Sequence, residues 1–300
     1  MIDAHVHIFP PYRSAGAVRW LKRAIPWMKV DETISETDIL ETLDFLGVSH
    51  FFNYVYPLSP GESRSLNEFN CQLSKRVKKA ICFGSVHPGN NDRKEIVEEA
   101  ILDFGLIGLK FHPFVQGFDI LDDRMDTIYQ TMERLNRPIV FHTGFDNFYG
   151  VRMRPEAMDT LLTRHPELVV VIAHMFYPDI EGAFKLLRKH NNVYLDGSNI
   201  FSGYREPADG ENVFEGKLVR DGGTEQYAVY FHHSLKELEE FSHRIMFGSD
   251  YPLCMNDLGR IYDTVRSLDI SGESIENISE RTAMQFVERF EQGFFPAKNP

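Results

Sequence analysis

Five side chains that suit metal ions lie where strands are expected to end. His5 and His7 stand two residues apart in Ile-Asp-Ala-His-Val-His, and residues at this spacing point to one face of a strand. His142 closes Ile-Val-Phe-His, His174 closes Ile-Ala-His, and Asp250 lies in Phe-Gly-Ser-Asp-Tyr-Pro. Imidazole and carboxylate groups bind Zn²⁺, and also Mn²⁺, Fe²⁺ or Co²⁺. With a position left open for water, such a set would be catalytic, because a bound divalent ion lowers the pKa of that water towards neutrality.

Each of these residues also has a purely structural interpretation. A histidine at the tip of a buried strand can be a core residue with a satisfied hydrogen bond. Asp250 could simply begin a turn. The argument for a metal therefore depends on all five residues falling at strand ends of one periodic chain.

Strand and helix patterns alternate along the chain. Short apolar runs alternate with stretches whose apolar residues recur every three or four positions. The expected strands cover residues 1–9, 48–56, 80–86, 106–112, 138–142, 168–174, 192–198 and 244–250, and the main expected helices cover 35–47, 62–79, 91–104, 122–136, 155–164 and 180–190. This alternation predicts an α/β fold with a parallel sheet, and the number of strands favours a distorted (β/α)8 TIM barrel. One domain over residues 1–300 is expected, because no linker, repeat or low-complexity tract interrupts the chain.

Two connections exceed the usual length of a loop. They cover residues 10–30, after the first strand, and residues 200–230, after the seventh. Both follow strands, so both are expected at the carboxyl end of the barrel, where the active sites of this fold lie. Either could be a functional lid or a solvated decoration.

Composition limits the partners and the location. The chain is 43% hydrophobic and 25% charged, which is typical of a soluble globular protein. A net charge of −12 argues against nucleic acid, and no apolar run is long enough to cross a membrane. Cys71, Cys82 and Cys254 are odd in number and widely spaced, which indicates neither a disulfide framework nor a cysteine zinc site. Met1 leaves no room for a signal peptide, so we expect a cytoplasmic protein with a small-molecule substrate, and a homodimer is compatible with the sequence.

The ordered motifs of the chain resemble those of the amidohydrolase superfamily. They run Ile-Asp-Ala-His-Val-His, Gly-Leu-Lys-Phe-His-Pro, Phe-His-Thr-Gly, Ile-Ala-His and Phe-Gly-Ser-Asp-Tyr-Pro, and they span essentially the whole chain. The chain is most similar to the amidohydrolase-related branch that includes aminocarboxymuconate semialdehyde decarboxylase. A helix expected over residues 278–290 matches the closing helix of that branch.

The resemblance implies roles for the five residues. His5, His7, His142 and Asp250 would hold the metal, and Asp250 would also accept a proton from bound water. His174 would hydrogen-bond that water or the substrate, and its near-neutral pKa would suit it to acid/base catalysis.

Lys110 bears on the number of metal ions. Lys110 and His112 share the inward face of the strand expected over residues 106–112. Two-metal members of the superfamily carry a carboxylated lysine that bridges the ions at this strand, whereas the lysine is commonly unmodified in the branch that this chain resembles. We therefore expect one divalent transition metal ion, Zn²⁺ before Mn²⁺ or Fe²⁺, with a second ion bridged by carboxylated Lys110 as the alternative. A structural interpretation pairs Lys110 with a buried carboxylate such as Asp3 or Asp196. Alternation along the first strand places Asp3 on the same face as His5 and His7.

Substrate-binding residues are expected around the carboxyl end of the barrel. Tyr149, Arg152 and Arg154 follow the fifth strand, while Lys110 and His112 approach from the fourth. An arginine at this place could hold a carboxylate with two hydrogen bonds, or it could pair with a neighbouring acidic residue. For His112 the alternative is a buried structural histidine.

Three functions remain open on this scaffold. The first is a metal-dependent hydrolase of an amide, lactone or ester, with proton transfer through Asp250 and His174. The second is a lyase, either a non-oxidative decarboxylase or a hydratase of an unsaturated or aromatic acid. The third is a barrel that binds a small ligand without converting it, and a metal-dependent nuclease ranks last. Because the sequence offers no clear carboxylate clamp, the hydrolase leads.

Overall fold

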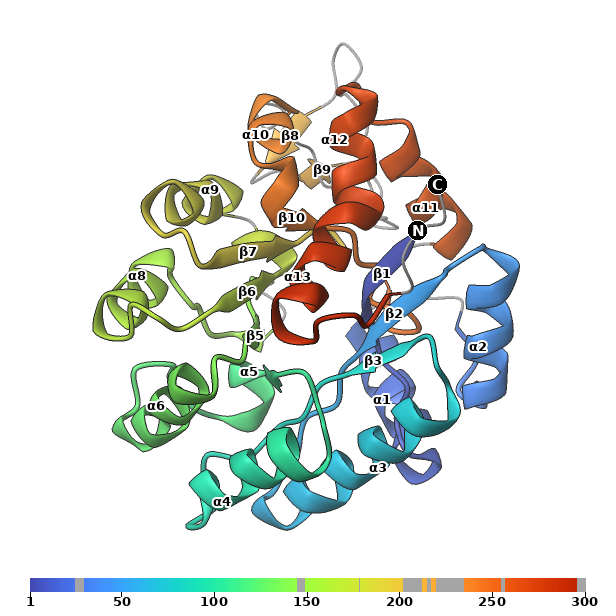
Figure 1. Ribbon diagram of the computed structural model, residues 1–300. Coiled ribbons are helices and arrows are strands. Elements are labelled where there is room, and N and C mark those ends of the chain that lie inside the picture. Colours follow the sequence, from blue (N-terminus) through green and yellow to red (C-terminus); the bar gives the residue numbers. More distant parts are fainter. Residues whose placement is uncertain are drawn as a thin grey trace.

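Eight parallel strands lie at the centre of the described part of the chain, and helices surround them (Figure 1). The structure is a computed structural model that describes residues 1–24, 30–144, 149–177, 179–201, 212–214, 217–219, 235–254 and 257–295. The parallel strands are β1 (Ile2–Val6), β2 (His50–Asn53), β3 (Ala80–Cys82), β4 (Leu109–Phe111), β5 (Ile139–His142), β6 (Val170–Ala173), β7 (Val193–Asp196) and β10 (Ile245–Met246). All eight strand predictions are confirmed, each with a shorter paired core than the expected stretch.

The helices follow the strands in the predicted alternation. They include α1 (Pro11–Ala24), α2 (Glu36–Phe45), α3 (Ser63–Arg76), α4 (Arg93–Glu98), α5 (Pro113–Gln116), α6 (Asp126–Leu135), α8 (Pro155–Arg164), α9 (Ile180–Lys189), α10 (Leu235–Glu240), α11 (Leu258–Arg266), α12 (Gly272–Glu276) and α13 (Thr282–Phe290). The start of α2 is a capping box, in which the side chains of Ser35 and Asp38 each accept a hydrogen bond from the other residue's backbone N–H. Gly47, at a φ of +73°, follows the end of this helix.

The strands form two sheets that meet at both edges. One sheet has the order β1-β2-β3 and the other the order β10-β7-β6-β5-β4. An isolated parallel bridge from Gly84 to Leu109 joins β3 to β4, and another from Val6 to Tyr251 joins β1 to the chain after β10. The α/β TIM-barrel prediction is therefore confirmed in its distorted form, because single bridges replace full ladders at these two edges.

A β-bulge in β1 changes which residues face the interior. Asp3 pairs with Phe51 but Val6 pairs with Asn53, so two residues of β1, Ala4 and His5, stand against one residue of β2. Below the bulge Ala4 belongs to the apolar cluster inside the barrel, and above it His5 turns inward. The expectation that Asp3 shares a face with His5 and His7 is wrong, because the Asp3 carboxylate accepts a 2.7 Å hydrogen bond from Tyr262 of α11.

Helix α13 closes the amino-terminal end of the barrel. It lies across the strand starts in Figure 1, and its contacts include β1 and β10. Its buried residues Phe286 and Val287 belong to the same apolar cluster as the inward side chains of the strands. This agrees with the closing helix expected over residues 278–290.

The structure describes the first of the two long connections predicted from the sequence more fully than the second. Residues 10–30 contain α1, so the first connection carries an element of its own. The second, over residues 200–230, lies mostly outside the described residues, which include there Ile200, Phe201 and the antiparallel strands β8 (Asn212–Phe214) and β9 (Lys217–Val219). Among the described helices, none has the length and apolar character needed to span a bilayer.

Candidate metal centre

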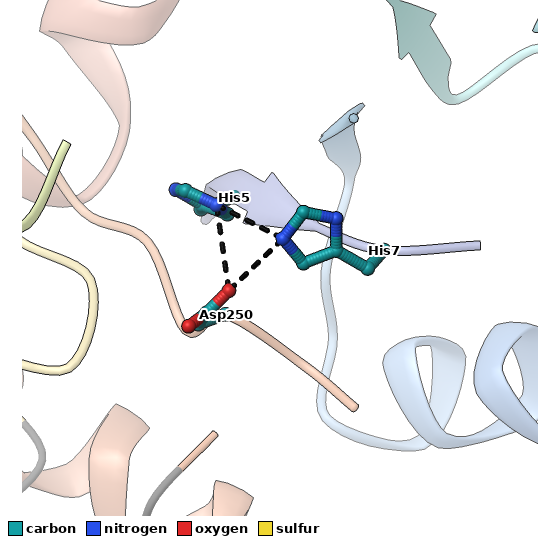
Figure 2. A group of neighbouring side chains, drawn as sticks. All are labelled: His5, His7 and Asp250. Atoms are coloured by element: carbon teal, nitrogen blue, oxygen red, sulfur yellow. Dashed lines mark hydrogen bonds and ion pairs between the residues drawn. The ribbon is translucent and has the colours of Figure 1, made fainter. Parts of the chain in front are cut away.

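Three predicted ligands meet at the carboxyl end of the barrel. Figure 2 shows the His5, His7 and Asp250 side chains pointing toward one another. The two Nε2 atoms lie 3.2 Å apart, and Asp250 Oδ1 lies 3.4 Å from His5 Nε2 and 3.1 Å from His7 Nε2. Ligand atoms on a tetrahedral ion with bonds of about 2.0–2.1 Å stand about 3.3 Å apart. The spacing of this group therefore fits one divalent ion.

The outer hydrogen bonds of the two imidazoles support the same conclusion. His7 Nδ1 lies 2.8 Å from the backbone carbonyl of Tyr54, which only accepts, so Nδ1 carries the proton. His5 Nδ1 faces the carboxylate of Asp196 and is assigned as a donor in the same way. Both Nε2 atoms then carry lone pairs, and they face a carboxylate oxygen. Three electron-rich atoms in mutual contact call for a cation between them.

Asp250 reaches this position through its backbone conformation. Its φ is +66°, in the left-handed region, and its backbone N–H donates a 2.8 Å hydrogen bond to the carbonyl of His5. Gly248 permits the close approach of this turn to β1, because a Cβ atom there would lie 2.8 Å from the Cβ of His5. The Asn199 amide donates a 2.5 Å hydrogen bond to Asp250 Oδ2.

His142 lies apart from the group of three. Its Nδ1 is 3.0 Å from His174 Nε2, and His174 Nδ1 is 3.0 Å from the backbone carbonyl of Ser198. Because that carbonyl only accepts, His174 Nδ1–H is the donor to it, and His142 Nδ1–H is the donor to His174 Nε2. This assignment leaves a lone pair on His142 Nε2. This Nε2 atom is buried without a hydrogen-bond partner among the described residues. His142 thus presents a ligating atom, but the structure does not bring it into contact with the other three residues.

Lys110 lies beside the metal group. Its Nζ is 3.4 Å from His5 Nε2 and 4.8 Å from the centre of the Tyr54 ring. Burial lowers the pKa of Lys110 to about 8, while Asp196 and Asp250 oppose this shift. Among the described residues no ion pair joins Lys110 to Asp196 or to Asp3, so the interpretation that pairs Lys110 with one of these carboxylates is not confirmed.

Burial favours the neutral form of four imidazoles at the site, those of His5, His112, His142 and His174. It lowers the pKa of His5, His112 and His142 well below the usual value, with neighbouring cationic or imidazole groups adding to the effect. Burial also lowers the pKa of His174 to about 4, although Asp250 opposes it. Burial raises the pKa of Asp196 to about 7.

A cavity of about 420 Å³ opens beside this group. Its walls are largely aromatic and aliphatic, and they include parts of α1. In the described part of the chain, Arg13 is the one lysine or arginine on its lining. The other lining residues are His7, Phe9, Tyr12, Gly16, Ala17, Trp20, Leu21, Tyr56, Leu58, His112, Val115, His142, Tyr149, Asn199, Asp250 and Leu253.

The predicted substrate-binding residues divide into two groups. His112 and Tyr149 line the cavity, and a 3.0 Å contact joins His112 Nε2 to the Tyr149 hydroxyl. Arg152 and Arg154 are exposed and are not among the lining residues, although residues 145–148 of their loop lie outside the described part. Lys110 is fully buried and is not a lining residue either. His174, predicted as the acid/base residue, is fully buried and does not line the described cavity either.

Sequence reasoning missed Arg13 and Asn199. The signal available for Arg13 was its place in the long connection after the first strand, which already predicts a lid or an element of its own. Asn199 had no signal beyond its closeness to the end of the seventh strand.

Comparison with known proteins places the chain in a family. The sequence model of the family described as amidohydrolase matches residues 2–273. The chain belongs to the amidohydrolase family. No curated protein sequence matches the chain, but solved structures do.

Three solved structures illustrate the similarity. The chain superposes on an uncharacterised TIM-barrel protein from Bordetella bronchiseptica with a TM-score of 0.71 and 17% identity, over 97% of this chain and 100% of that one. It superposes on 5-carboxyvanillate decarboxylase from Sphingomonas paucimobilis with a TM-score of 0.65 and 14% identity, over 96% and 98%. For 5-carboxyvanillate decarboxylase from Novosphingobium aromaticivorans, complexed with manganese and 4-hydroxy-3-methoxy-5-nitrobenzoic acid, the TM-score is 0.63 at 11% identity, over 96% and 95%. At these identities the structures establish the shared fold.

Proposed function

We propose that this member of the amidohydrolase family is a divalent-metal-dependent lyase that removes carbon dioxide from a small aromatic or unsaturated carboxylic acid. The observation that carries the proposal is the position of Arg13 on the wall of a cavity that Asp250 and His7 also line. The sequence alone offered no clear carboxylate clamp, and Arg13 supplies one. The decarboxylase structures with the same fold support this choice over a hydrolase.

Arg13 has hydrogen-bonding capacity for a ligand. Its guanidinium carbon lies 5.9 Å from the centre of the Phe9 ring and 5.7 Å from that of Tyr56. One Nη1–H donates a 2.7 Å hydrogen bond to the Tyr56 carbonyl, and the nearest carboxylate, Glu62, is 3.9 Å away. A guanidinium has five N–H donors, so further donors remain for a substrate carboxylate. The aromatic residues around Arg13 suit a flat substrate.

The reaction needs a cation, a carboxylate clamp and a proton donor. A divalent ion held by His5, His7 and Asp250 would supply positive charge for substrate oxygen atoms and lower the pKa of bound water. In decarboxylation the bond from carbon to the carboxyl group breaks, carbon dioxide leaves, and the electron pair on the remaining carbon takes up a proton. Arg13 would bind and orient the acid before this step. Asp250, which lines the cavity, would pass to this carbon a proton that it first accepts from water in the site.

The proposed ligand set includes His142 as the fourth member. His142 lines the cavity, and its Nε2 atom is buried without a hydrogen-bond partner among the described residues, which suits it to this role. His174 would orient His142 through the hydrogen bond at Nδ1. We propose one ion, Zn²⁺ or Mn²⁺.

Metal analysis of two variants tests these assignments. Protein purified without chelator should contain about one equivalent of a transition metal. His142→Ala should lose most of the metal, whereas His174→Asn should keep it with an affinity lowered by about 10- to 100-fold. Metal-free wild-type protein that also fails to take up added Zn²⁺ or Mn²⁺ would refute the metal proposal. Full retention of metal in His142→Ala would remove His142 from the ligand set.

Arginine variants test the substrate class. The protein loaded with Mn²⁺ should release carbon dioxide from one or more members of a panel of hydroxybenzoic and unsaturated acids. Arg13→Gln should raise the KM for that acid by about 10- to 100-fold, as expected for a lost hydrogen bond to a charged group. Arg154→Gln is the matched control, because Arg154 is exposed and does not line the described cavity. An unchanged KM in Arg13→Gln would contradict the clamp.

Hydrolysis is the second candidate function. The family description favours it, and the three-residue group would serve an amide, lactone or ester equally well. Incubation of the same loaded protein with such substrates in ¹⁸O-labelled water separates the two. Incorporation of the label without release of carbon dioxide would favour the hydrolase over the lyase.

A further inference from the structure

One short turn contacts three side chains of the site. Asp196, the last residue of β7, bonds His5 Nδ1. In the turn that follows, the Ser198 carbonyl accepts from His174 and the Asn199 amide donates to Asp250. The contact of Asn199 differs from the others, because it reaches the carboxylate that both lines the cavity and faces the two imidazoles. Building on the proposed metal site, we infer that Asn199 is a positioning residue that makes Asp250 present Oδ1 alone to the ion.

The geometry of the carboxylate carries this inference. Asn199 Nδ2 lies 2.5 Å from Asp250 Oδ2, while Oδ1 lies 3.1 Å from His7 Nε2. An amide nitrogen can only donate, so this bond fixes which oxygen faces the amide and which faces the imidazoles. Asn199 is 3% exposed and Asp250 is 7% exposed, so water competes little for either side chain. Groups that orient a metal ligand in this way contribute to metal affinity without touching the ion.

A structural alternative exists for Asn199. Its φ is +61°, and asparagine is one of the few residues with a side chain that tolerates this left-handed conformation. The residue could therefore serve the backbone alone. Glycine separates the two roles, because it accepts the same conformation and lacks the amide.

The experiment compares Asn199→Gly with Asn136→Gly. Asn136 has a φ of +48° at the end of α6 and is exposed, so it undergoes the same chemical change away from the site. Mn²⁺ is titrated calorimetrically into each metal-free protein, and thermal unfolding in chelator checks that each variant is folded. We expect Asn199→Gly to bind Mn²⁺ about 10- to 100-fold more weakly than wild type, and Asn136→Gly to bind it as wild type does.

A second variant covers the case in which Asn199→Gly does not fold. Asn199→Asp keeps the shape and the backbone preference but places an oxygen opposite Asp250 Oδ2. We expect the visible absorption of bound Co²⁺ to change, because Asp250 loses the bond that fixes its orientation. Unaltered Mn²⁺ affinity in Asn199→Gly, or an unaltered Co²⁺ spectrum in Asn199→Asp, would overturn the inference. A wild-type protein that binds no Mn²⁺ would instead refute the proposed metal site.

Discussion

The two ends of the barrel differ in the polarity of their interior side chains. At the amino-terminal end, apolar strand residues pack against α13, and the interior cluster contains no charged side chain. At the carboxyl end, histidines, acids and Lys110 gather within the same ring of strands. The cluster that packs against α13 extends up to Tyr54, which lies beside Lys110, and it comprises Ile2, Ala4, Phe52, Tyr54, Ile81, Phe83, Ile107, Val140, Val169, Val171, Ala173, Met246, Ala283, Phe286 and Val287.

Backbone conformation separates the two ends as well. Of the six described non-glycine residues with positive φ, five follow β6, β7 or β10 at the carboxyl end: His174, Met175, Phe176, Asn199 and Asp250. Such conformations cost on the order of 1–3 kcal/mol each and are retained where the surrounding structure enforces them. Apolar packing at the amino-terminal end therefore stabilises the fold. The carboxyl end instead holds strained backbone conformations that orient its polar side chains.

The largest expected effect is a loss of folding stability that leaves the Mn²⁺ affinity of the folded protein unchanged. Phe286 is fully buried in α13, with ring centres 6.1 Å from Phe52 and 5.0 Å from Tyr194. Phe286→Ala removes a large side chain from this core and should lower the free energy of unfolding by about 3–5 kcal/mol. Chemical denaturation measures this loss, and Mn²⁺ titration of the folded protein should give the wild-type affinity.

Phe45 provides the control for this substitution. It is 89% exposed on α2, so Phe45→Ala should change the free energy of unfolding by less than about 0.5 kcal/mol. If Phe286→Ala weakened Mn²⁺ binding strongly in the folded protein, the two ends would not be independent.

The second expected effect combines stability and metal binding. A Cβ atom at Gly248 would lie 2.6 Å from Asp196 Oδ1 and 2.8 Å from the Cβ of His5. Gly248→Ala should therefore destabilise the fold by about 1–3 kcal/mol. Because the clash displaces His5 and its hydrogen-bond partner, Mn²⁺ affinity should also fall by about tenfold or more.

Gly272 is the matched control at a site with space. No atom lies within 4 Å of a Cβ built on this residue, which begins α12. Gly272→Ala should be neutral or stabilising, with metal affinity unchanged. If Gly248→Ala and Gly272→Ala had the same stability and the same Mn²⁺ affinity, the close approach of the chain at Gly248 would not be required for either property.

The regular parts of this molecule could be predicted because they follow local patterns. Alternation along β1 places His5 and His7 together, and the strand end before Asp250 has a turn sequence. The β1 bulge could not be predicted, because it depends on pairing with β2 and not on the residues of β1 alone. For this reason Asp3 was wrongly placed on the face of the two histidines.

Long-range packing explains the remaining differences. Arg13 reaches the cavity only because α1 folds back over the carboxyl end, and no local pattern specifies that path. His142 was correctly expected at a strand tip, yet it lies outside the group that His5, His7 and Asp250 form. Alternation predicts which face a side chain occupies, and it does not predict distances across the barrel.

The smallest expected effect lies in the hydrogen bonds between the site and its supports. Ser198 Oγ is 3.1 Å from His5 Nδ1 and 3.0 Å from His174 Nδ1, but each nitrogen also has another acceptor. Ser198→Ala should therefore cost about 1 kcal/mol or less and weaken Mn²⁺ binding no more than about fivefold. Ser242, a buried serine before β10 that accepts from Asn277, is the control and should lose similar stability with no change in affinity. A much larger loss of Mn²⁺ affinity in Ser198→Ala would mean that the hydroxyl, and not Asp196 or the backbone carbonyl, sets the orientation of these imidazoles.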